Sequence, residues 1–168
     1  MGPQIFSHFY LESLTADAKK AGRLRKHDNI HDSYNESCQR LMNAISVGSY
    51  IAPHRHHLDP KNECLIAVRG VFAAIIFNNT GEINCIEYFG TEKFENLSVG
   101  LELRSQSWHT VLALEEGSII FEVKEGPFQP AESKEYAPWA PGEDSVEAKA
   151  YYAHLMLECR REFEKKNA

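Results

Sequence analysis

The sequence predicts an all-β domain, an antiparallel sandwich or barrel, with a short helical segment before it and a helix after it. Between about residues 39 and 124, short apolar and β-branched runs alternate with turn signals such as Asp59-Pro60 and Glu115-Glu116-Gly117. No helical pattern interrupts these runs, so a parallel sheet with crossover helices is not expected. The 168 residues suit one domain and leave no room for two full domains.

Eight short runs carry the strand pattern. They are residues 39–46, 49–55, 63–69, 71–77, 83–88, 97–103, 108–114 and 118–123. Their spacing is typical of an antiparallel sandwich or barrel.

The flanking segments differ from this core. Residues 15–21 are good helix formers, with Ser13 or Thr15 as caps and Gly22 as the end, and the polar, cationic residues 23–31 predict an ordered loop. Beyond Gly126-Pro127, a segment rich in proline and aromatic residues predicts an arm, and helical spacing follows from Asp144 to about Lys166. We therefore expect one domain over residues 1–168, with a β core at about 39–124, an N-terminal lid segment at about 13–35, and a C-terminal arm and helix at about 126–168.

Composition and charge exclude several classes of protein. The chain is 43% hydrophobic and 25% charged, with a formal net charge of -6, which argues against general binding of nucleic acid or anionic membranes. No apolar run approaches the ~20 residues of a membrane-spanning helix, and no secretory signal is recognisable. The cysteines, Cys38, Cys64, Cys85 and Cys159, form no C-x-x-C pair and are typical of reduced thiols in a cytoplasmic protein.

A candidate metal site begins with His54 and His56, whose side chains share one face of a strand. The following turn is expected to bring Glu63, at the start of the next strand, onto the same face of a β-hairpin. His109 opens a later strand and is a candidate fourth ligand. Three imidazoles and a carboxylate suit one divalent transition metal ion (Fe, Zn, Mn or Ni), with open coordination positions. The alternative is a polar pocket without metal.

This spacing resembles a known family of barrels. The segment Gly48-x5-His54-x-His56-x6-Glu63-x6-Gly70 is similar to the first cupin motif, and Trp108-His109 falls where the second motif places its histidine. The gap from His56 to Glu63 is longer than usual. The resemblance implies a cupin barrel, also called a double-stranded β-helix or jelly roll.

More narrowly, the chain resembles the WbuC family of cupin-fold metalloproteins. The matching segments are Arg23-x-Arg25, Asn29-Ile30-His31, Gln39-Arg40, Ser49-Tyr50-Ile51-x-Pro53-His54-Arg55-His56, Trp108-His109-Thr110-Val111, Phe121-Glu122-Val123-Lys124-x-Gly126-Pro127 and Lys134-x-Tyr136-Ala137-Pro138-Trp139-Ala140-Pro141. The resemblance implies the fold and the metal site, and the family name points to surface-polysaccharide gene clusters. It implies no established activity.

Further candidates for the site lie in and after the N-terminal segment. If that segment folds over the barrel mouth, Arg25 is a candidate clamp for a carboxylate or phosphate, with His27 as a weaker ligand-binding candidate. His31 is a candidate proton relay, since a histidine titrates near neutral pH. Gln39 is a further substrate-binding candidate, because a neutral amide is cheaper to bury than a charge. Tyr50 shares the face of His54 and is either a catalytic, hydrogen-bonding residue or part of the core.

Three functions fit these residues. The first is a metal-dependent enzyme acting on a small anionic or sugar-derived substrate. The others are a non-catalytic, metal-dependent ligand binder or sensor, and a nucleotide-sugar isomerase or epimerase whose histidines act without metal. We also expect a homodimer, because residues 71–77 are apolar on both faces and need cover from the C-terminal helix, the arm or a second subunit.

Overall fold

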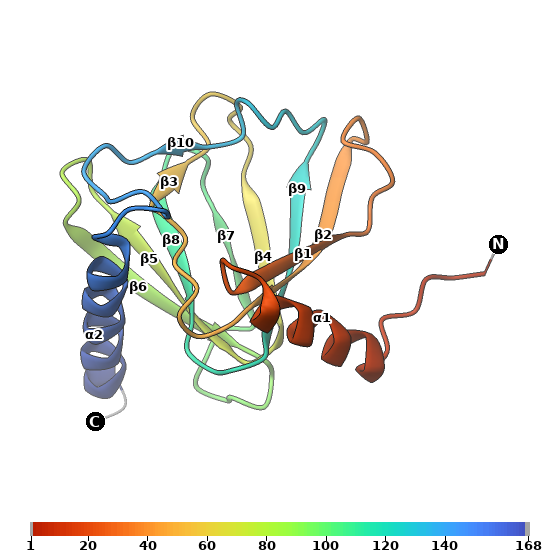
Figure 1. Ribbon diagram of the computed structural model, residues 1–168, viewed down its shortest axis with the longest axis horizontal. Coiled ribbons are helices and arrows are strands. Elements are labelled where there is room, and N and C mark those ends of the chain that lie inside the picture. The colour runs from red at the N-terminus through yellow and green to blue at the C-terminus, as the bar shows by residue number, and fades with distance from the viewer. Residues whose placement is uncertain (1, 167–168) are drawn as a thin grey trace.

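Two five-stranded antiparallel sheets face each other in the computed structural model, which describes residues 2–166 (Figure 1). The elements are α1 (His8–Lys20), β1 (Arg25–Asn29), β2 (Cys38–Ile45), β3 (His54–Arg55), β4 (Glu63–Arg69), β5 (Val71–Phe77), β6 (Ile83–Gly90), β7 (Gly100–Leu103), β8 (Trp108–Ala113), β9 (Ser118–Glu125), β10 (Glu135–Tyr136) and α2 (Ala148–Lys166). One sheet has the order β1-β2-β9-β4-β7 and the other β10-β3-β8-β5-β6. This is the cupin barrel that the sequence predicts.

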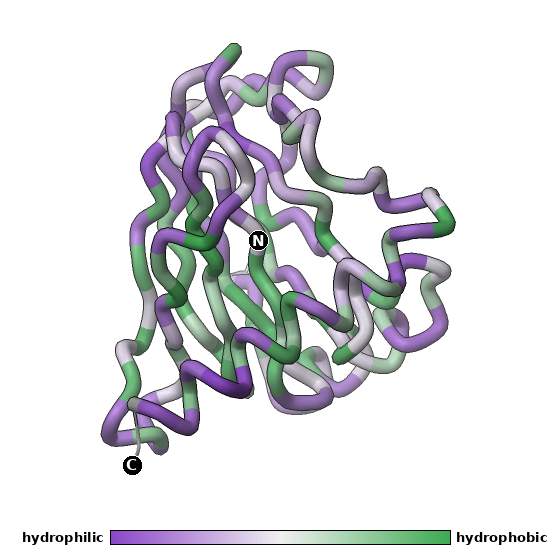
Figure 2. Tube along the Cα trace, turned by 90° about the vertical axis from the view of Figure 1, so that its left-hand side faces the viewer, coloured by the Kyte–Doolittle hydropathy of each residue, from purple (hydrophilic) through white to green (hydrophobic). Residues whose placement is uncertain are grey.

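Both faces of strand β5 are apolar because both are covered by other parts of the protein. Phe72 and Ala74 lie in the core between the sheets, whereas Ala73, Ile75 and Phe77 belong to an outer cluster that includes Leu155 of α2. The other helix, α1, packs on the outside of the opposite sheet, against β2 and β9. Figure 2 shows hydrophobic segments along the strands and mostly hydrophilic loops at the upper end. Neither helix within residues 2–166 is long and apolar enough to cross a membrane.

The N-terminal segment differs from the prediction in two ways. The helix begins at His8 rather than at residue 15, because Ser7 caps it by accepting a hydrogen bond from the backbone N–H of Tyr10. The predicted loop is wrong, since Arg25–Asn29 forms β1 and pairs with β2 along its whole length. An edge strand that lines a polar cavity needs no apolar residues, so hydrophobic periodicity did not reveal it.

The predicted strand 49–55 is also wrong in most of its length, because only His54–Arg55 forms a strand. Pro53 lacks the N–H that a sheet ladder uses, and β3 is accordingly short. The arm, expected to be irregular, contributes β10, which pairs with β3. The C-terminal helix begins at Ala148, after turns in which the Ser145 and Ala148 N–H groups bond to residues three positions earlier.

Gly70 lies between β4 and β5, where the packing leaves no room for a side chain. Its φ of 79° disfavours any other residue, and a Cβ there would lie 2.1 Å from Ser118 Oγ. We expect Gly70→Ala to lower the free energy of unfolding by about 2 to 4 kcal/mol, from backbone strain and overpacking together. Urea denaturation measures this loss, and Gly142→Ala, where a Cβ meets no atom within 4 Å, is the control. Equal midpoints for the two variants would contradict the prediction.

Candidate metal centre

Four side chains meet inside the barrel: His54, His56, Glu63 and His109. One ligand atom from each lies within 4.8 Å of the others, and all four residues are buried. His54 and His109 are directly paired across β3 and β8, whereas Glu63 opens β4 in the opposite sheet. The expected β-hairpin is therefore wrong, although the residues converge. The long gap after His56 lets the chain cross from one sheet to the other.

Each histidine is oriented by a backbone carbonyl. Nδ1 of His54 lies 3.0 Å from the Ala52 oxygen, Nδ1 of His109 lies 2.8 Å from the Ser107 oxygen, and Nδ1 of His56 contacts the Ser133 oxygen. Because a carbonyl only accepts hydrogen bonds, each Nδ1 carries the proton and each Nε2 keeps its lone pair. The same second contact orients histidine ligands in metal sites generally.

The Nε2 atoms of the histidines and the carboxylate oxygens of Glu63 are the atoms available to bind a metal ion. Nε2 of His56 has no hydrogen-bond partner among the described residues, yet it lies 3.0 Å from Oε1 of Glu63. Nε2 of His109 lies 3.6 Å from the other carboxylate oxygen. Lone pairs that face each other at these distances repel unless a cation lies between them. The four residues therefore fit a divalent metal ion.

The protonation states agree with this arrangement. Burial, with the charge of Lys134 and the neighbouring His109, holds the pKa of His54 well below its usual value, so its ring is neutral. Burial alone would raise the pKa of Glu63, but the Lys124 ammonium, which donates to its carboxylate, helps to lower it well below its usual range. Neutral imidazoles and an ionised carboxylate are the forms that bind metal.

Lys124 is a buried neighbour of this cluster that the sequence analysis did not single out. It lies directly opposite Glu63 in the β4–β9 ladder, and its Nζ is 3.0 Å from Oε1 of Glu63. Nζ is also 3.0 Å from Nδ1 of His56, but that nitrogen already donates to Ser133. The ammonium therefore donates to Glu63 and shares its charge.

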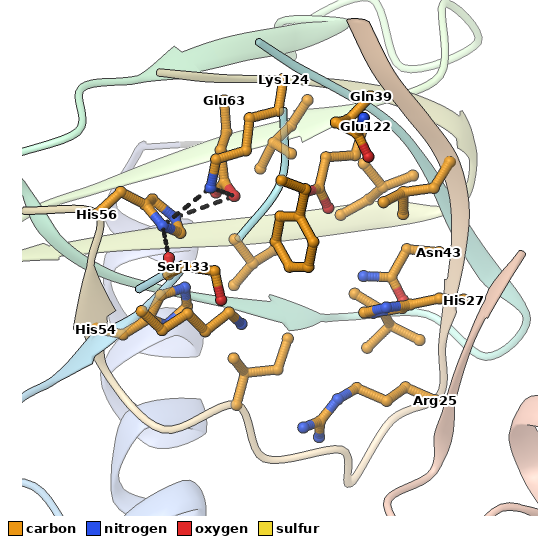
Figure 3. Close-up of a pocket in the computed structure, with 18 of the residues that line it drawn as sticks. Arg25, His27, Gln39, Asn43, His54, His56, Glu63, Glu122, Lys124 and Ser133 are labelled. Carbon is orange, nitrogen blue, oxygen red and sulfur yellow. Dashed lines mark hydrogen bonds and ion pairs between the residues drawn. The ribbon is translucent and has the colours of Figure 1, made fainter. Parts of the chain in front are cut away.

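The cluster opens into a cavity of about 190 Å³ between the sheets. Figure 3 shows His54, His56 and Glu63 along one side, and Gln39, Asn43, His27 and Arg25 along the other. Arg25, His27, His31 and Gln39, all named from the sequence, line this cavity. Their roles as ligand-binding or catalytic groups remain predictions.

Arg25 already has partners within the protein. Its Nη1 donates to the Tyr50 carbonyl at 2.9 Å, and its Nη2 pairs with the Glu143 carboxylate. Only 6% of its side chain is exposed. Its charge is therefore largely balanced by Glu143, so the geometry favours a structural ion pair over a free anion clamp.

Tyr50 does not lie in the cavity. Its ring packs against Tyr151 in the outer cluster under α2, and its hydroxyl donates to the Pro141 carbonyl at 2.8 Å. Pro53, just before the two-residue strand β3, interrupts the strand alternation that placed Tyr50 beside His54. The structure therefore places Tyr50 in the core, which was one of the two alternatives from the sequence.

Glu122 is a second cavity residue that the sequence analysis did not select for the site. Its side chain lies on the inward face of β9, together with the side chains of Ile120 and Lys124. Burial and the nearby Glu63 carboxylate raise the pKa of Glu122 to about 8. Near neutral pH this carboxyl group therefore keeps a proton.

His27 gives the metal-free protein a pH dependence that can be measured. His27 lies in the cavity, where its ring is only partly hydrated. This loss of hydration and the charges of Lys134, Arg25 and Arg23 lower its pKa to about 4. The unfolded chain then binds more protons than the native protein between pH ~6.5 and ~4, so stability falls as pH falls through that window. The slope is at most ~1.4 kcal/mol per pH unit, and smaller for an accessible ring.

We expect His27→Gln to reduce this acid-induced loss of stability. The measurement is urea denaturation of both metal-free proteins at several pH values between 7 and 4. If the free energy of unfolding falls equally with pH in the variant and the wild type, His27 does not contribute to the acid-induced loss of stability.

Comparisons with known proteins agree with the fold. The model of a family described as a domain of unknown function (DUF6016) matches residues 6–87. A comparison with curated proteins finds no match. The capsular polysaccharide assembling protein CapF from Staphylococcus aureus is similar at 18% identity and a TM-score of 0.54, over 69% of this chain and 32% of CapF. Protein SO0799 from Shewanella oneidensis is similar at 9% identity and a TM-score of 0.53, over 66% of this chain and 72% of that protein.

The barrel has a cupin fold, and its buried cluster fits a metal ion. The chain spans about a third of CapF, and identities this low show a shared fold alone. The narrower assignment to the WbuC family stays a prediction.

Proposed function

We propose that the protein is a metal-dependent enzyme acting on a small anionic or sugar-derived substrate. The observation that supports this most is the set of three oriented histidines and Glu63 at the wall of a charged cavity. A divalent ion bound there would act as a Lewis acid toward a substrate oxygen. The identity of that ion (Fe, Zn, Mn or Ni) is left to the experiment.

Two carboxyl groups with different proton affinities support catalysis rather than binding alone. In the metal-free protein Glu63 is ionised, whereas burial and the Glu63 charge raise the pKa of Glu122 to about 8. Such a pair is a common basis for assigning acid and base roles. In this proposal Glu122 donates its proton to the reacting group. Lys134, whose pKa is lowered by burial against the opposing charge of Glu63, binds an anionic part of the substrate.

The N-terminal residues then act on the substrate from the other side. Nδ1 of His31 lies 3.0 Å from the Arg40 backbone N–H and 2.9 Å from the Arg40 carbonyl oxygen. The N–H can only donate, and that carbonyl already accepts from the Ile30 N–H, so Nδ1 accepts and Nε2 keeps its proton. His31 thus serves as a hydrogen-bond donor in the cavity wall, more than as the proton relay expected from the sequence.

The test begins with protein purified without oxygen. We expect close to one transition metal ion per chain, and mass spectrometry of released small molecules identifies the ligand class. With a substrate found this way, Glu122→Gln should keep metal and ligand but lower kcat by ~10²–10⁴-fold, the usual contribution of an acid–base group. A wild-type protein that binds its ligand and never changes it is a binder or sensor instead.

We further propose the WbuC family, with a role in surface-polysaccharide metabolism, a cytoplasmic location and a homodimer. Several segments of the WbuC resemblance contribute to one cavity, and Cys38, Cys64 and Cys159 are free thiols. The outer face of β5 is covered by α2 of the same chain, so the dimer rests instead on exposed apolar side chains at the N-terminus, Ile5 at 69% and Phe9 at 82%. Light scattering of wild type and Phe9→Ser tests it, since a monomeric wild type removes the dimer.

A further inference from the structure

The cavity wall opposite the metal centre carries buried polar atoms without partners. Among residues 2–166, Nε2 of His31, Oε1 of Gln39 and Oδ1 of Asn43 are buried and make no hydrogen bond. The three residues are only 6%, 3% and 6% exposed. Unpaired buried polar atoms are costly, and each one in a native protein needs an explanation. All three residues line the same cavity.

The orientation of two of these groups is fixed by their neighbours. Nε2 of Gln39 lies 2.8 Å from the Glu36 carbonyl, with two further carbonyls at 3.3 Å, so the amide must present its oxygen on the other side. Nε2 of His31 is a donor, because Nδ1 accepts from the Arg40 backbone N–H. The Arg40 carbonyl, 2.9 Å from Nδ1, accepts from the Ile30 N–H instead. The wall therefore offers acceptors and a donor close together.

The strand register places this wall at a definite position relative to the metal centre. In the first sheet, Gln39 of β2 lies opposite Lys124 of β9, which in turn lies opposite Glu63 of β4. Asn43, four residues along β2, lies opposite His27 of β1. Figure 3 shows Gln39 and Asn43 across the cavity from His54 and His56.

We infer that this wall, made of His31, Gln39 and Asn43, binds the hydroxyl groups of a polyhydroxylated acid whose carboxylate end lies toward the metal. A hydroxyl both donates and accepts, so it satisfies amide oxygens and an imidazole N–H together. A carboxylate at the wall would face two acceptors, and an ammonium would face the charges of Lys134 and Arg25. The cavity of about 190 Å³ has room for a ligand the size of one sugar ring.

This inference rests on the proposed metal centre for the carboxylate end alone. The hydroxyl end depends on unpartnered atoms of the protein itself. The two can therefore be tested separately.

The test is calorimetric titration of the full-length, metal-loaded protein with matched six-carbon compounds. The probes are sugar acids (gluconate, galactonate, mannonate, glucuronate and galacturonate), hexanoate, which has the carboxylate without hydroxyls, and glucitol, which has hydroxyls without the carboxylate. We expect at least one sugar acid to bind tenfold or more tightly than hexanoate, a factor that one or two hydrogen bonds supply.

The decisive variant is Asn43→Leu, with Leu41→Met, a cavity residue on the same strand, as the matched control. Asn43→Leu should weaken sugar-acid binding about tenfold while leaving hexanoate binding and metal content unchanged. Its thermal midpoint should stay the same or rise, because a buried polar atom without a partner is removed. If Asn43→Leu does not fold, Asn43→Ala is used in its place.

Three results would overturn the inference: no sugar acid binds better than hexanoate, Asn43→Leu weakens both probes equally, or it lowers the midpoint with binding unchanged. Metal analysis keeps the two claims apart. If the wild type takes up no metal, the proposed function fails. The loss of glucitol binding in Asn43→Leu then still decides whether the wall binds hydroxyls.

Discussion

His54→Ala and Glu63→Ala are each expected to lose most of the bound metal, whereas wild type holds close to one ion per chain. Each variant leaves three ligands, and loss of even an orienting partner of a ligand typically costs ~10–100-fold in metal affinity. Loss of the ligand itself should cost at least that much. Elemental analysis after dialysis against a weak chelator measures the remaining metal.

His57→Ala is the matched control for these variants. His57 follows His56 directly, but it is exposed and bonds to Gln106 at 2.7 Å, so its loss should leave metal content unchanged. Full occupancy in His109→Ala would remove His109 from the ligand set. A wild type that stays empty when titrated with Fe, Zn, Mn and Ni salts would contradict the metal centre altogether.

The metal cluster was predictable because its signal is local. His54-x-His56 places two rings on one face through the two-residue period of an extended chain, and turn residues mark where the next strand begins. The strands β4 and β5 were predicted with their observed bounds for the same reason, since both carry long apolar runs between turn signals.

The partner strands were not predictable from local signals. Pairing of β3 with β8 and of β4 with β9 depends on contacts between distant parts of the chain, so the sequence analysis placed Glu63 in a hairpin with the histidines, whereas it comes from the opposite sheet. Which residues pair across a barrel is a property of the whole fold.

The polar residues of β9 that line the cavity escaped detection for a different reason. In an ordinary half-buried strand, alternating charged residues face water. In β9, Glu122 and Lys124, two positions apart, face the cavity instead. Arg25 and His27 of β1 also line it, as expected from the sequence. A pattern of polar residues at every second position does not say whether the polar face meets solvent or a binding site.

Arg25→Met is expected to lower the free energy of unfolding by about 3 to 5 kcal/mol, the usual cost of removing one partner from a buried ion pair. The pair with Glu143 joins β1 to the segment before α2, and Arg25 also binds the Tyr50 carbonyl. Without the guanidinium, both acceptors lose their partner. Arg23→Met is the matched control, since Arg23 reaches the same carboxylate at 3.6 Å but is 66% exposed, and its loss should cost under ~1 kcal/mol.

The pH dependence of the Arg25→Met effect gives it a second signature. Burial would raise the pKa of Glu143, but the hydrogen bond and charge of Arg25 hold it below its usual value. This depressed pKa stabilises the protein above pH ~4.5, and the contribution is lost as pH falls through the lower native value. The stability difference between wild type and Arg25→Met should therefore shrink in acid, and Arg25→Met with Glu143→Gln should cost less than the two single changes added together. An Arg25→Met protein as stable as Arg23→Met, yet weaker toward carboxylate ligands, would instead make Arg25 the anion clamp predicted from the sequence.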